Sequence, residues 1–221
     1  MRPLIVAAVL IVTFSRLAGA ADSPLPASAS AAAVIREMNA ARQNPQLYAG
    51  YIEDLRATFD GSTMTLPGGK RFRTKEGSHA LDEAIGFLRA ATPMAPLIFS
   101  PGMSRAAADH CMSQIGGGFG HAGGDRSDPG ARMNRYGAWS LGWGENLAYG
   151  KNTARDVVVA LIVDDGLRER KHRKNIFSAK FAVAGAAFGK HAKFGAVCSI
   201  DFAGAYAEAK GETPSGLLAT N

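Results

Sequence analysis

Two β-rich segments lie next to each other near the C-terminus, at about 182–188 and 195–202, and the periodic segments before them are helical. The glycine-containing stretch 189–191 between them is typical of a hairpin connection. Adjacent strands joined in this way pair antiparallel, and a sheet of so few strands needs helices to cover its apolar face. The order of elements therefore predicts an α+β domain with a small antiparallel sheet covered by helices.

The helices are predicted from their capping residues and their apolar spacing. Ser100 followed by Pro101 marks one start, because serine is a good N-cap and proline suits the first turn. Thr153 and Asp156 form a capping-box-like start for a later helix, which Gly166 is expected to end. The predicted helices cover about 31–43, 45–59, 81–90, 101–115 and 153–166, whereas 61–75 and 168–174 are predicted to be loops.

The N-terminus has the pattern of an export signal. Arg2 precedes an apolar run that is shorter than the roughly 20 residues needed to span a bilayer, and Ala18-Gly19-Ala20 suits a signal peptidase. An uncleaved tether is the alternative. Cleavage would remove Arg2, Arg16 and no acid, so the formal charge would fall from +6 to +4. We expect a secreted or periplasmic protein with a signal peptide at 1–20, a flexible leader at 21–30, one domain at 31–207 and a loose tail at 208–221.

Composition excludes several other classes of protein. Hydrophobic residues make up 47% of the 221 residues, which is too many for a disordered chain, and the 2 cysteines are too few for a disulfide scaffold. The modest positive charge suits anionic cell-surface polymers or lipid head groups as partners, and nucleic acid is a poor candidate. We expect a monomer with no transmembrane span after signal cleavage.

Four segments place polar or ionisable residues next to glycine or in a dense polar cluster. Glycine lets the backbone adopt unusual angles and approach a ligand closely, so such segments are candidates for a binding or catalytic site. They are GFGHAG at 118–123, GENLAYG at 144–150, VDDG at 163–166 and HRKNIF at 172–177.

In this order the segments resemble the CAP superfamily, which includes cysteine-rich secretory proteins, venom antigens and pathogenesis-related proteins, and especially its bacterial secreted, SCP-like members. The similarity runs from about 31 to 203, and the combination of GENLAYG with the later HRKNIF segment is its most specific part. The resemblance implies an α-β-α sandwich with a central cavity that holds two histidines and two acids.

The resemblance also assigns candidate residues to that cavity. His121, Glu145 and His172 match the first histidine, the acid of the GEN segment and the second histidine. Asp164 matches the second acid, although a leucine stands where relatives often have tryptophan, and Asp165 is the alternative because it lies on nearly the same helix face. A further departure is a lysine directly before His172, where bacterial relatives commonly have glycine.

Such a cavity allows three chemical roles. The histidines His121 and His172 could ligate zinc or another divalent metal, they could move protons without a metal, or the four residues could form a polar network that binds nothing. Lipid-binding relatives favour a binding module for a small apolar or amphipathic ligand or for a cell-envelope component. The alternatives are a zinc-assisted hydrolase, with Glu145 or Asp164 activating water, and a structural envelope protein.

Residues outside the four candidate cavity positions also have predicted roles. Cys111 in the 101–115 helix and Cys198 in the last strand allow one intramolecular disulfide, with two buried free thiols as the alternative. His110 is expected to face solvent or a polar edge. Trp143 and Tyr149 flank the GEN segment and could wall a ligand groove.

Overall fold

A computed structural model describes residues 30–65 and 68–210 of the chain. The predicted signal peptide, nearly all of the predicted leader and the tail from 211 onward lie outside the described residues. The helices are α1 (Ala31–Gln43), α2 (Pro45–Arg56), α3 (Ser78–Ala90), α4 (Pro101–Ser113), α5 (Pro129–Met133), α6 (Ala154–Val163) and α7 (Lys171–Ile176). The strands are β1 (Phe59–Asp60), β2 (Thr63–Thr65), β3 (Arg71–Arg73), β4 (Ile98–Phe99), β5 (Gly137–Tyr149), β6 (Val183–His191) and β7 (Gly195–Glu208).

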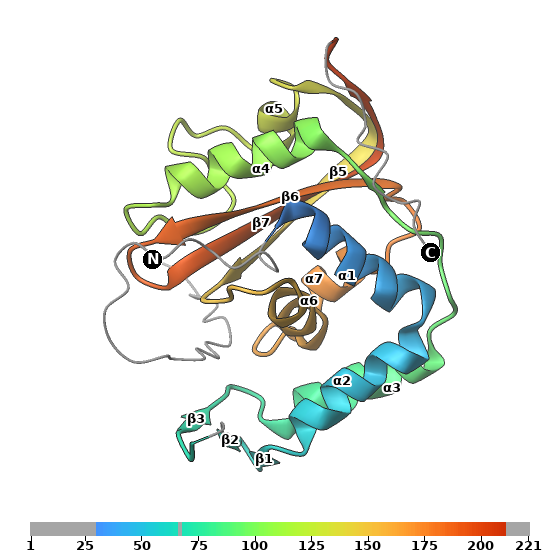
Figure 1. The fold of residues 1–221 in the computed structure, drawn as a ribbon, viewed down its shortest axis with the longest axis vertical. Coiled ribbons are helices and arrows are strands. Elements are labelled where there is room, and N and C mark those ends of the chain that lie inside the picture. Colours follow the sequence, from blue (N-terminus) through green and yellow to red (C-terminus); the bar gives the residue numbers. More distant parts are fainter. Residues whose placement is uncertain (1–29, 66–67, 211–221) are drawn as a thin grey trace.

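A four-stranded sheet lies between two layers of helices (Figure 1). Its order is β4-β6-β7-β5, and its long strands β5, β6 and β7 pair antiparallel, while the short β4 runs parallel to β6. Helices α4 and α5 lie on one side of the sheet, and α1, α6 and α7 lie on the other, with the α2–α3 pair beyond them. The predicted α+β class and the α-β-α sandwich are confirmed. Within the described residues, none of the helices is both long and apolar enough to cross a membrane.

The two predicted N-caps are confirmed, but α3 begins at Ser78 rather than near 81, and α2, α4 and α6 end earlier than predicted. The Ser100 hydroxyl accepts a hydrogen bond from Met103 N, and the Thr153 hydroxyl accepts one from Asp156 N. Helix α6 ends at Val163 rather than near the expected glycine stop. The next residue, Asp164, adopts a left-handed conformation with φ 55° and so closes the helix itself.

Both late strands are longer than predicted. The stretch 189–191 belongs to β6, because His191 pairs with Gly195 and only 192–194 form the turn. The last residue of β7, Glu208, accepts hydrogen bonds from the Ser100 hydroxyl and Gly102 N, so the first residue of the predicted tail is anchored to the start of α4.

Three segments predicted as loops or left unassigned form regular structure. The GENLAYG segment is the end of β5, an edge strand that pairs with β7 from Gly137 to Tyr149 around a bulge. The region 61–75 contains β2 and β3, which join β1 in a separate three-stranded sheet. The charged run 168–174 includes the start of α7. These segments are rich in glycine and charged residues, so they lack a local pattern typical of strands or helices. Their conformation depends instead on pairing with distant parts of the chain.

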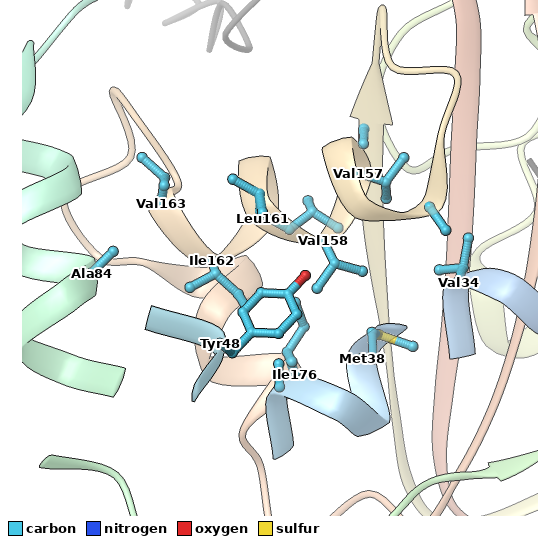
Figure 2. Close-up of a cluster of buried hydrophobic side chains, with 14 of the residues drawn as sticks. Val34, Met38, Tyr48, Ala84, Val157, Val158, Leu161, Ile162, Val163 and Ile176 are labelled. Carbon is cyan, nitrogen blue, oxygen red and sulfur yellow. The ribbon is translucent and has the colours of Figure 1, made fainter. Parts of the chain in front are cut away.

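The largest core cluster lies between the sheet and α1, α2, α3 and α6. Figure 2 shows side chains from α1 and α6 together with Ile176 gathered around Tyr48. Val158 and Ile162 of α6 are completely buried, and each such side chain contributes about 1.5–3 kcal/mol of burial free energy. This packing fixes the C-terminal end of α6, where the predicted site residue Asp164 lies.

The two cysteines lie on opposite faces of the sheet. Cys111 packs in a cluster with Val197 beneath α4, whereas Cys198 packs in the core on the other side. Successive residues of a strand point to opposite faces, so Val197 and Cys198 cannot both face α4. The two thiols are buried and free in the structure, and the predicted disulfide is not formed.

Candidate functional site

The loop after α4 carries His121 and is fixed through its neighbour Gly120. The carbonyl oxygen of Gly120 lies 2.7 Å from Gln114 Nε2 and 3.0 Å from His110 Nε2, and its N–H donates to the Tyr149 hydroxyl over 3.0 Å. Gly120 has a φ of +91°, a conformation that favours glycine. These contacts place His121 over the edge strand β5.

Glu145 is the buried partner of His121. Its carboxylate lies 2.7 Å from His121 Nδ1, accepts a hydrogen bond from Arg132 Nη2 at 2.5 Å and another from the Ser199 hydroxyl at 3.2 Å. The side chains of Glu145 and Arg132 are each 1% exposed, while that of His121 is 56% exposed. Arg132 also donates to the carbonyl oxygens of His121 and Ser127, so one guanidinium holds both the acid and the loop.

His172 forms a second histidine–acid pair with Asp164. His172 Nδ1 lies 2.7 Å from Asp164 Oδ1, and the backbone N–H of His172 donates to Asp164 Oδ2 at 3.0 Å. The alternative acid, Asp165, instead accepts hydrogen bonds from the backbone N–H groups of Lys75 and Glu76. Asp164 is therefore the acid next to the second histidine, and Asp165 anchors a neighbouring loop.

An ion-pair network around two buried arginines supports the His172 segment. Arg170, with a φ of 50°, donates to Glu76 at 2.7 and 2.8 Å and also to Glu83. Hydrogen bonds from Arg170 lower the pKa of Glu76 to about 2 and also lower the pKa of Glu83. Arg173 is buried as well and donates to Glu83 and to the Ile162 carbonyl oxygen. Arg170 and Arg173 are therefore buried, although both lie in the segment 168–174 that the sequence predicts to be a loop.

Two cavities meet at the first histidine–acid pair. One has a volume of about 500 Å³, and the other has a volume of about 420 Å³; His121 and Glu145 line both. The larger cavity also includes His172, so the structure brings both predicted histidines to one cavity. Its remaining lining residues are Phe119, Gly120, Leu147, Tyr149, Leu167, Lys171, Lys174 and Asn175, whereas Trp143 and Pro129 line the smaller cavity.

The donor set does not form a three-ligand zinc site. The described part of the chain contains no group of three or more His, Cys, Asp or Glu residues that could hold a metal ion. His121 and His172 each use Nδ1 on a carboxylate, and Glu145 is already engaged by Arg132. A catalytic zinc site uses three protein ligands and an open position. The arrangement provides two imidazoles whose Nδ1 atoms are held by carboxylates and whose Nε2 atoms remain for hydrogen bonding, proton transfer or ligation of a metal.

Three buried residues next to the site are absent from the set of site residues predicted from the sequence. His110, expected near solvent, is completely buried, and burial lowers its pKa. Asp201 is also completely buried, and its position in an otherwise apolar strand was an available signal, since a buried charge needs an explanation. Arg132 had no such signal, because nothing in the sequence pairs it with Glu145, which lies 13 residues later in the chain.

The chain is similar to two bacterial proteins of known structure and matches the model of one protein family. No curated protein matches it significantly. An outer surface protein of Borrelia burgdorferi is 17% identical with a TM-score of 0.41, and the alignment covers 50% of this chain and 78% of that protein. An extracellular SCP-domain protein of Bacillus anthracis is 17% identical with a TM-score of 0.39, and the alignment covers 57% of this chain and 39% of that protein. The model of the CAP, or cysteine-rich secretory protein, family matches residues 35–202, and the chain therefore belongs to this family.

Proposed function

We propose that the protein is an exported binding module that takes a small amphipathic ligand into the cavity between His121 and His172. The observation that carries this proposal is the pair of adjoining cavities, about 500 and 420 Å³, that share His121 and Glu145. Ligand sites are typically concave and mainly apolar, with a few polar groups that fix orientation. Both cavities have this composition.

The lining of the larger cavity indicates the chemistry of the ligand. Phe119 stacks on Tyr149 with a centroid distance of 4.7 Å, and this pair supplies an apolar wall. Lys171 and Lys174 lie along α7 on the same cavity, next to His172. An apolar body with an anionic head group complements these walls, and either a lipid-like molecule or an envelope component can supply that combination.

Export is part of the proposal. It is supported by the signal-like pattern of residues 1–20 and by membership of a family described as secretory. A hydrolase is less well supported. The described residues offer no three-ligand metal group, and the serines near the motifs, Ser140 and Ser178, are not set in a nucleophile-elbow pattern.

A fluorescence titration with the anionic amphiphile anilinonaphthalene sulfonate tests the proposal. Phe119 is 49% exposed on the cavity wall, and Phe87 is 36% exposed on α3. We expect saturable binding to the wild-type protein, weaker binding to Phe119→Ala and unchanged binding to the matched control Phe87→Ala. Equal effects of the two variants would contradict a site in this cavity.

The charge preference is tested in the same assay. Lys174→Gln should weaken binding of the anionic probe and make the remaining binding less sensitive to salt, because it removes a positive charge at the cavity. Lys70→Gln, which makes the same change next to the separate three-stranded sheet, should have no effect. Identical salt dependence in Lys174→Gln and the wild type would remove the anionic head group from the proposal.

A further inference from the structure

Asp201 is a fully buried acid whose carboxyl group has no hydrogen-bond donor. It lies on β7 with no exposed surface. Among the described residues, neither of its carboxyl oxygens accepts a hydrogen bond. An ionised carboxylate without water or donors is strongly disfavoured, so the environment favours the neutral acid.

The acid paired with Asp201 across the sheet is Glu145. The two residues are directly opposite each other in the β5–β7 register, so their side chains share a face and their Cβ atoms lie about 4.5–5.5 Å apart. Glu145 already accepts hydrogen bonds from Arg132 and Ser199 and lies against His121. The negative charge of Glu145 is therefore compensated by Arg132. A second negative charge at Asp201 would have no positive partner.

The other titratable groups around Asp201 do not supply the missing positive charge. Burial raises the pKa of Asp201 well above its usual value, and the neighbouring Glu145 raises it further, against a smaller opposing effect of Arg132. Tyr206 and Cys111 also interact electrostatically with Asp201, and the pKa of each is raised, so both are neutral at pH 7. His110 in α4 lies 3.9 Å from Glu145, and burial lowers its pKa, so it does not supply a positive charge at pH 7.

We propose that Asp201 carries a proton in the folded protein and donates it in a hydrogen bond to Glu145, which positions the Glu145 carboxylate on His121. One proton is thus shared between two carboxyl groups, and their single negative charge is balanced by Arg132. Asp201 is a positioning residue, since it reaches the cavity only through Glu145. The inference depends on the buried geometry and not on which ligand the cavity binds.

Infrared spectroscopy of the full chain tests the protonation. A protonated carboxyl group has a carbonyl stretch separate from those of carboxylates and amides, and this band shifts in heavy water. We expect the band at neutral pH in the wild type, its loss in Asp201→Asn, and its retention in Asp82→Asn, which changes an acid that is 53% exposed. A spectrum in which Asp201→Asn removes no such band would overturn the proposal.

Nuclear magnetic resonance of the His121 ring tests the positioning. An oriented Glu145 holds the ring proton on Nδ1, so the tautomer population reports the contact. Asp201→Asn keeps a donor of the same shape and should preserve the wild-type Nδ1–H population, whereas Asp201→Ala should lower it. Equal populations in the two variants would overturn the positioning role. If Asp201→Ala does not fold, Asp201→Asn is compared with the wild type, and a lowered Nδ1–H population in it counts against the proposal.

Discussion

Replacing Arg132 with methionine should destabilise the protein, because it leaves the negative charge of Glu145 buried without a compensating positive charge. Arg132 is 1% exposed and its guanidinium lies 2.5 Å from Glu145, whose side chain is equally buried. Methionine retains much of the apolar volume but leaves the carboxylate without its cation. Removal of one partner from a buried ion pair typically costs about 3–5 kcal/mol of unfolding free energy. The same change also removes the hydrogen bonds that hold the carbonyl oxygens of His121 and Ser127.

Urea unfolding at neutral pH measures this effect, and a double-mutant cycle separates it from packing. Arg132→Met with Glu145→Gln removes both charges and should lose less stability than the two single changes added together. Arg135→Met is the matched control, because Arg135 pairs with Asp109 and Asp125 at the surface, where ion pairs contribute little. The reasoning is refuted if Arg132→Met loses less than about 1 kcal/mol, or if it loses no more than the control.

The remaining predictions concern pH. Arg170→Met should remove a part of the stability that depends on pH in the acid range. The pKa of Glu76 is about 2 in the folded protein, against a usual value of 4.5. The stabilisation is therefore present above pH 4.5 and is lost as pH falls towards 2. Chemical unfolding across this range should show a weaker dependence on pH in the variant, and an unchanged slope would contradict the role of the ion pair. Burial lowers the pKa of Lys151 from 10.5 to about 8, so the contribution of this residue to stability should rise as pH increases from 8 to 10.5. Lys151→Met should abolish this rise and should increase the free energy of unfolding by up to about 3 kcal/mol at pH 7. A lower free energy of unfolding in the variant at pH 7 would refute the conclusion that the buried charge of Lys151 is destabilising.

Local signals predicted the elements that local interactions determine. The caps at Ser100 and Thr153 are formed by side chains that bond within their own first turn, so three or four residues of sequence suffice. The edge strand β5 had no such signal. Its glycine-rich segment lacks an alternating pattern, and its conformation depends on pairing with β7, about 60 residues later in the chain.

The same distinction applies to the site. The motif resemblance named the two histidines and two acids, and the structure pairs His121 with Glu145 and His172 with Asp164. The groups that support them lie at varied distances along the chain: Arg132 is 13 residues before Glu145, and Ser199 is 54 residues after it. Arg170 lies in a segment that the sequence predicts to be a loop, and its partner Glu76, 94 residues away in the chain, is beside it only in the folded protein. Local charge patterns therefore identify residues that can form ion pairs, but they do not show which of these residues are buried.

The most direct test of the proposed binding function is native mass spectrometry of the protein purified from its own host. A binding module with an amphipathic site should carry a noncovalent small molecule that is released on denaturation and is depleted in Phe119→Ala but not in Phe87→Ala. A mass equal to that of the polypeptide alone, together with probe binding that Phe119→Ala leaves unchanged, would contradict the proposal.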